Sequence, residues 1–345
     1  RDTDRSRGLG DVYKRQIPGL TLNGRVAADL TVDKIENKNR ADNAHVFSTN
    51  GQYSDSYGLN NSRYQIVYSD VMLMFDRTFN ELHNVTANLG WTARQESYYK
   101  SDVSTSQGLT QENWFHLNAS VGTKNASMSR EDLLKTGAFL TASYGYNGWG
   151  FLEGSIRQEK TSTLKKGNNS FWYPSASASI LYTELFKDQM PTWWNYGKVR
   201  ASYGIVGNAP ELYRAVLAFK QESLLRGSTY SYNYIDKKIG NESIKPETKY
   251  EFEIGLENKF FGNRLGMEFN FYSNTIKDQI LQTTSAASMG AQSMLMNVGE
   301  LSNKGVEFSV YGTPIENKDW KRDLRANVAW NKNTVNKLAD GLDVL

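Results

Sequence analysis

Several residue types and patterns that mark common protein classes are missing or scarce in this 345-residue chain. It contains no cysteine, which excludes disulfide bonds and thiolate metal sites. No stretch approaches the roughly 18 consecutive apolar residues of a membrane-spanning helix, and no long helical periodicity is present. The net charge of +3 comes without a basic run, so nothing indicates a nucleic-acid-binding protein.

Patterns typical of catalytic and metal sites are also missing. The three histidines, His45, His83 and His116, are scattered without the spacing of metal ligands. The chain has no nucleophile elbow and no phosphate-binding glycine loop, and no pair of carboxylates is set in an apolar context. We therefore expect no enzyme activity and no cofactor or metal.

What the chain does have is strict alternation of apolar and polar residues. The clearest runs cover residues 246–260 and 265–272, joined by the tight turn Gly262-Asn263, and a third follows at 305–312. A period of two predicts strands with one apolar and one polar face, and the turn predicts a hairpin. The charged residues expected on the polar face, toward a watery lumen, are Arg200, Glu253, Glu257, Glu268 and Glu307.

About eleven such strands are predicted, and the segments that join them alternate in length. Short connections lie near residue 80 and at 147–148, 262–263 and 314–319, whereas long polar ones lie at 35–61, 102–133, 208–244 and 281–301. Transmembrane β-barrels have short turns at one end and long loops at the other. We expect an all-β, antiparallel transmembrane β-barrel in a bacterial outer membrane. The 185–195 connection is longer than the other turns, and its Trp193-Trp194 pair predicts an anchor at the membrane interface.

Several motifs resemble those of a known family. They are Lys245-Pro246-Glu247-Thr248, Glu253-Ile254-Gly255-Leu256, Asn297-Val298-Gly299 and Asn303-Lys304-Gly305-Val306-Glu307. Two upstream stretches, 173–179 and 198–208, add to the likeness in the same order. Together they resemble the SusC/RagA family of TonB-dependent outer-membrane transporters. The motif positions carried over are Pro246, Glu247, Gly255, Asn297, Gly299, Asn303, Gly305 and Glu307.

The resemblance implies a barrel of about 22 strands. An N-terminal plug would close its lumen, TonB would open it, and a SusD-like surface lipoprotein would cover it. The implied cargo is an oligosaccharide or a peptide, and the implied surroundings are outer-membrane lipid. Residues 17–345 would form part of the TonB-dependent receptor β-barrel domain, with the plug and the final strands absent. We therefore expect an internal part of a larger protein.

Residues 1–16 do not fit this pattern. Seven residues at the start are charged at nearly every position, and the rest of the segment lacks alternation. We interpret residues 1–16 as a non-native or disordered tail.

Aromatic residues in the predicted long loops are candidate contacts for cargo or for the covering lipoprotein. They are Tyr230, Tyr232, Tyr234 and Trp114, and the three tyrosines are expected to meet the Met289–Met296 segment. Packing of the loops themselves would produce the same composition. Two other functions stay open at this point: a soluble β-rich carbohydrate-binding or adhesion module, and a passive porin-like barrel.

Overall fold

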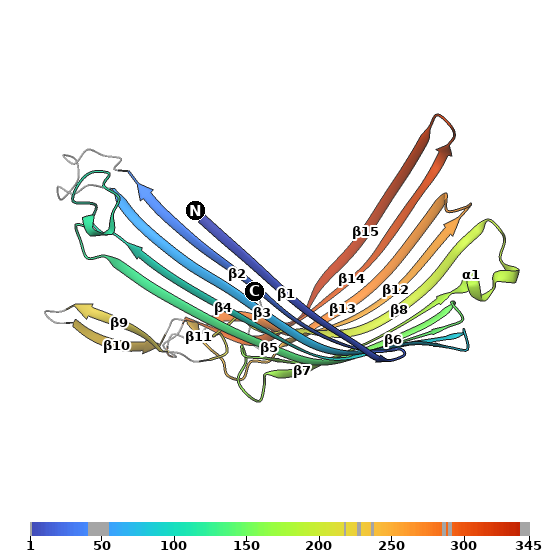
Figure 1. Ribbon diagram of the computed structural model, residues 1–345, viewed down its shortest axis with the longest axis horizontal. Helices are drawn as coiled ribbons and strands as arrows, with labels where there is room; N and C mark the ends of the chain where they lie inside the picture. Colours follow the sequence, from blue (N-terminus) through green and yellow to red (C-terminus); the bar gives the residue numbers. More distant parts are fainter. Residues whose placement is uncertain are drawn as a thin grey trace. The chain divides into compact units, whose positions relative to one another are not determined.

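The computed structural model describes residues 2–40, 55–216, 219–225, 229–235, 238–284, 288 and 292–338, and most of them lie in β-strands (Figure 1). The strands before the longest loop are β1 (Asp2–Ile17), β2 (Leu20–Asn39), β3 (Ser56–Phe79), β4 (His83–Ser104), β5 (Asn125–Tyr146), β6 (Gly150–Thr161), β7 (Ser170–Leu181) and β8 (Trp194–Asn208). The later strands are β9 (Phe219–Leu225), β10 (Thr229–Ile235), β11 (Lys238–Ile239), β12 (Glu247–Phe260), β13 (Leu265–Thr284), β14 (Ser293–Glu316) and β15 (Lys321–Lys337). No helix in the described part of the chain has the length and apolar character needed to cross a membrane.

The strands follow one another in the sheet almost in chain order. The 13-stranded sheet runs from β1 through β8 to β12, β13 and β14, with β15 paired to β14 and the short β11 added in parallel to β14. Strands β9 and β10 form a separate two-stranded sheet (Figure 1). The chain divides into two compact units: Arg1–Tyr13, Gly24–Val71 and Thr92–Lys135 make the first, and Lys14–Asn23, Met72–Trp91 and Thr136–Leu345 make the second. The antiparallel all-β prediction is confirmed.

Strand register in the second unit separates an apolar face from a polar face. One row of directly opposed residues crosses five strands: Val199, Leu256, Phe269, Phe308 and Val328. The next row consists of Arg200, Gly255, Asn270, Glu307 and Ala329. Because side chains alternate along a strand, these rows lie on opposite faces, and Glu253, Glu257 and Glu268 share the second face. Large apolar side chains of the first row stay exposed, as a lipid-facing surface requires.

The connections predicted to be short are tight turns. Asn147 and Gly148 have φ angles of 44° and 72°, which are the positive values that a type I′ hairpin turn requires. The longer connection between β7 and β8 contains the helical turns α1 (Tyr182–Leu185) and η3 (Lys187–Gln189). Its Trp193 ring stacks on Phe261 at 5.7 Å, and the Trp194 indole donates a hydrogen bond of 3.0 Å to Asn258 Oδ1. An aromatic cluster therefore closes this end of β8 and β12.

Tyr182 joins this cluster from α1. Its ring meets Trp194 edge-on at 5.7 Å, and its hydroxyl donates a hydrogen bond to Asn258. Burial raises the pKa of Tyr182 more than this hydrogen bond lowers it. The hydroxyl therefore stays protonated at neutral pH and can keep donating to Asn258.

The strands are longer and more numerous than the sequence predicts. Strand β2 continues to Asn39 and β13 to Thr284, both inside segments expected to be loops. A transmembrane strand needs only about 9–11 residues to cross the hydrocarbon. Beyond that band both faces of a strand are wet, so side-chain alternation stops while backbone pairing continues. For this reason the alternation of apolar and polar residues does not predict the ends of these strands.

The sequence also did not predict a strand in residues 1–16. Residues 2–17 form β1, which pairs with β2. Arg5 Nη2 lies 2.8 Å and Arg7 Nη2 lies 2.9 Å from Asp29 Oδ2 on β2. Cross-strand charge pairs replace the apolar alternation that is missing there. That these residues are non-native stays a prediction.

Candidate functional site

The polar face carries a network centred on Arg200 of β8. Its Nη2 lies 3.1 Å from Glu253 Oε1, 2.7 Å from Asn270 Oδ1 and 3.7 Å from Glu268 Oε1. Gly255 makes this possible, because a Cβ there would lie 2.7 Å from Arg200 Nε and 2.8 Å from Asn270 Oδ1. The structure thus joins three of the residues predicted to face the lumen. Glu257 pairs instead with Lys259 at 3.1 Å, and Glu307 lies opposite Asn270.

A second glycine of the family motifs has a similar steric reason. Gly305 on β14 lies directly opposite Tyr272 on β13, whose ring covers it. A Cβ at Gly305 would overlap that ring and would lie 2.8 Å from the Trp330 carbonyl oxygen. Asn303, two residues earlier, faces Asn274 and Asn333 on the neighbouring strands, and its Oδ1 is buried without a hydrogen-bond partner in the described structure.

Asn297 and Glu247 form hydrogen bonds where the longest loop returns to the sheet. Asn297 accepts a 2.8 Å hydrogen bond from the Lys245 N–H and donates to the carbonyl oxygens of Lys245 at 2.8 Å and Asp278 at 2.7 Å. Glu247 accepts from Asn208 Nδ2 at 2.8 Å and from the Ile280 N–H at 3.3 Å.

Both residues hold an irregularity in β13. The register shifts between Ile276 and Ile280, and Asp278 there has a φ of 55°. Gly299 lies opposite Gln279 in this bulge, and Pro246 comes directly before Glu247. The motif residues at this place therefore position backbone.

Beyond this point the loops pack into a small core, which we name the loop cap. Its fully or nearly fully buried members are Leu164, Ala215 and Ile244, and the partly buried Phe171, Ala209, Ile280 and Leu295 pack against them. Lys165 and Glu242 form an ion pair, and Asn241 Nδ2 donates a 3.0 Å hydrogen bond to the Leu295 carbonyl oxygen. The loop cap was missed from the sequence, although single apolar residues such as Leu164 and Ile244 in polar segments were a signal.

A cavity of about 250 Å³ opens in the loop cap, and we name it the loop-cap pocket. It is lined by polar and charged residues, Tyr213, Arg214, Lys238, Gln282 and Ser293, together with apolar ones such as Leu212 and Leu295. Gln282 Nε2 donates a 2.8 Å hydrogen bond to Ser293 Oγ, and Ser293 is 8% exposed. Ser293, Met294 and Leu295 belong to the Met289–Met296 segment named from the sequence, but the other lining residues were not proposed, because the lining comes from four separate segments of the chain.

The aromatic candidates fall into different parts of the structure. The Tyr232 and Tyr234 rings on β10 lie 6.0 Å apart, and Tyr232 is exposed. Tyr230 pairs with Leu224 through the backbone, and its side chain is outside the described part. Trp114 stacks on His116 at 6.3 Å in the other unit. Met289 lies outside the described residues, so the predicted meeting of the tyrosines with the 289–296 segment stays a prediction.

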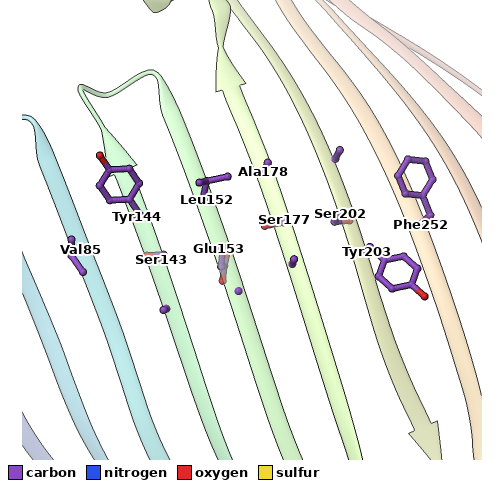
Figure 2. Close-up of a pocket in the computed structure, with 14 residues that line it drawn as sticks. Val85, Ser143, Tyr144, Leu152, Glu153, Ser177, Ala178, Ser202, Tyr203 and Phe252 are labelled. Atoms are coloured by element: carbon purple, nitrogen blue, oxygen red, sulfur yellow. The ribbon is translucent and has the colours of Figure 1, made fainter.

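A larger hollow, of about 640 Å³, lies on the apolar face. Figure 2 shows the Tyr144 ring on one side and the rings of Tyr203 and Phe252 on the other, with Leu152 and Ala178 between them. Leu152 lies opposite Ala178, and Ala178 lies opposite Ala201, so small residues form its floor. Its apolar lining fits hydrocarbon rather than a water-soluble ligand.

Comparison with known proteins agrees with this architecture. The family described as TonB dependent receptor-like, beta-barrel, matches residues 2–344. TonB-dependent receptor P3 of Formosa agariphila is 30% identical over 196 residues, which are 55% of this chain and 19% of that protein. TonB-dependent receptor SusC of Bacteroides thetaiotaomicron is 34% identical over 119 residues, which are 34% of this chain and 12% of that protein.

The fold has a counterpart among solved structures. The structure of the RagAB peptide transporter superposes with a TM-score of 0.89 at 22% identity, covering 99% of this chain and 37% of that one. The chain thus spans well under half the length of these relatives. Fold and membrane location were predicted from the sequence, and they are confirmed: the chain belongs to the TonB-dependent receptor-like β-barrel family, is similar to SusC and to the RagAB structure, and is part of an outer-membrane protein.

Proposed function

We propose that the protein carrying this chain imports a nutrient across the outer membrane in a TonB-dependent manner. The observation that carries the proposal is the family match over residues 2–344. The separated faces of β8 and β12–β15 support it, since one face suits lipid and the other a watery path. The protein is not proposed to be an enzyme, because transport across a membrane needs no catalytic group in the barrel wall.

The proposed cargo is an oligosaccharide or a peptide, and the proposed partner is a SusD-like surface lipoprotein. Peptide cargo is supported by the likeness to the structure titled RagAB peptide transporter. The lipoprotein and oligosaccharide cargo are what the resemblance of the sequence motifs to the SusC/RagA family implies. TonB would act through a part of the protein outside this chain.

A passive porin-like barrel is the rival function, and energy dependence separates the two. Uptake of candidate cargo should be measured in cells expressing the full-length protein, with and without functional TonB. We expect uptake to stop when TonB is removed while the amount of protein in the outer membrane stays the same. Equal uptake with and without TonB would favour the passive barrel and contradict the proposal.

A further inference from the structure

We propose that the loop-cap pocket binds a carboxylate group of the cargo, so that the imported oligosaccharide or peptide is acidic. This inference rests on the proposed import function and specifies its substrate class. The shared chemistry is a carboxylate, which a uronic acid and an acidic amino acid both supply.

Charge is the first argument. Arg214 and Lys238 both line the pocket, and no Asp or Glu is among the lining residues that the structure describes. Arg214 pairs with Glu211 at 3.4 Å, and the Glu211 side chain is 82% exposed. A pair this exposed contributes little stability and is easily exchanged for another carboxylate. The pocket therefore offers two cations to an anionic ligand.

Fixed backbone is the second argument. Arg214 directly precedes the fully buried Ala215, and its carbonyl oxygen accepts a hydrogen bond of 3.4 Å from the Asn241 N–H. Lys238 belongs to β11 and pairs in register with Ser293 of β14. The two cations thus project from a packed loop and from the sheet. Binding a ligand there requires less ordering of the chain than binding on a free loop.

Neutral groups complete the site. Gln282 Nε2 donates to Ser293 Oγ, so the serine hydroxyl still carries a proton that it can donate, and the Gln282 side-chain oxygen can accept. Tyr213 offers an exposed ring, on which a sugar or a planar side chain can stack. Apolar residues such as Leu212, Met294 and Leu295 line the remaining wall and strengthen the attraction of the cations for a carboxylate.

The volume of the loop-cap pocket limits the size of the ligand that it can hold. The volume of about 250 Å³ is below the roughly 300–1,000 Å³ of pockets that hold a whole drug-sized ligand. The pocket therefore suits one acidic unit of a longer cargo, with the rest of the cargo lying outside.

The test uses full-length protein purified in detergent and titrated by calorimetry with matched probes. The sugar arm compares a galacturonic acid trimer with a neutral galactose trimer, and the peptide arm compares Glu-Glu-Glu with Gln-Gln-Gln. We expect the acidic member of one arm to bind about tenfold more tightly than its neutral partner, and that arm identifies the source of the carboxylate. Equal affinity of acidic and neutral probes in both arms would overturn the inference.

Variants test the residues. Arg214→Gln combined with Lys238→Gln should weaken binding of the acidic probe about tenfold and should leave the neutral probe unaffected. Lys166→Gln is the matched control, because Lys166 is exposed on the β6–β7 loop and does not line the pocket. Binding by the unmodified protein should also weaken with added salt, and this dependence should shrink in the double variant. Retention of full acidic affinity in the double variant would refute the site.

The failures of the two proposals can be told apart. If the acidic probe binds through Arg214 and Lys238 but is never taken up with TonB present, the import function fails while the site stands. If cargo is taken up in a TonB-dependent way, but acidic and neutral probes bind equally well and the double variant keeps this affinity, the proposed site is wrong while the import function stands.

Discussion

At the residue scale, Gly255 and Gly305 matter because they have no Cβ atom, which leaves space for atoms of neighbouring strands. The Tyr272 ring covers Gly305, and the Trp330 carbonyl oxygen also lies too close to leave room for a Cβ atom there. Gly255 likewise leaves room for the Arg200 guanidinium. The sequence marked both positions through the resemblance to a family. It could not give the steric reason, because Tyr272 and Arg200 lie on other strands.

Gly305→Ala should therefore destabilise the barrel. The new methyl group must displace either a packed ring or backbone, and such overpacking costs about 1–3 kcal/mol. Unfolding can be followed by the loss of the folded band on unboiled gels as urea increases. Gly154→Ala is the control, since a Cβ there would meet only the Ser175 carbonyl oxygen, at 3.8 Å. Equal midpoints for the two variants would show that the ring over Gly305 moves aside freely.

Asn297 allows a second prediction at this scale. Asn297→Ala removes hydrogen bonds to Lys245 and to the bulge at Asp278. Because each such bond contributes about 1 kcal/mol net, the loop return should open more often. Hydrogen exchange of the Lys245 and Ile280 amides should then speed up by at least about tenfold. Asn331→Ala on β15 should leave these amides unchanged. Slow exchange in the Asn297 variant would mean that the bulge is held by strand pairing alone.

At the element scale, the sequence predicted strands wherever one face is apolar. The register of β8 and β12–β15 puts Leu256, Phe269 and Phe308 in one row, as a period of two requires. Where both faces of a strand are wet, apolar and polar residues do not alternate. For this reason the sequence did not predict β1 or the outer ends of β2 and β13. It also missed β9 and β10, which form a hairpin inside the longest loop and pair with each other in the described structure.

Substitution to arginine on the two faces tests which one meets lipid. Phe308→Arg should cost about 2–4 kcal/mol if the site lies near the bilayer midplane, whereas Glu307→Arg should cost much less. These residues are neighbours on β14, so they lie at nearly the same depth. Glu307 is a better control than Glu268, because Glu268 already lies 3.7 Å from Arg200. Refolding into lipid vesicles at several urea concentrations measures both. Equal tolerance would contradict the assignment of the faces.

At the scale of the whole molecule, the long-loop end has two candidate contact surfaces. One is the loop-cap pocket, which joins residues far apart in the chain and so escaped the sequence. The other is the tyrosine run on β10, which the sequence did indicate by composition. Sequence patterns thus locate surfaces made by one segment. Surfaces made by several segments require the strand pairing and the buried contacts of Ala215 and Ile244.

Replacing Tyr230, Tyr232 and Tyr234 together by alanine tests the second surface. Each aromatic contact with cargo or with the covering lipoprotein contributes about 0.5–1.5 kcal/mol beyond its buried area. Cargo uptake or co-purification of the lipoprotein should therefore fall at least about tenfold, since 1.4 kcal/mol corresponds to that factor. The amount of folded protein in the outer membrane should not change, because among the described strands β9 and β10 pair only with each other.

The control for the tyrosines is an exposed aromatic residue at the other end of the strands. Trp320 is 65% exposed in the turn between β14 and β15, whereas the tyrosine run belongs to the connection between β8 and β12. Successive antiparallel strands place these two connections at opposite ends of the sheet. Trp320→Ala should therefore leave cargo uptake and lipoprotein binding intact. If the triple variant matches Trp320→Ala in both assays, the β10 tyrosines serve only to pack their own hairpin, and contact with cargo must lie elsewhere at this end.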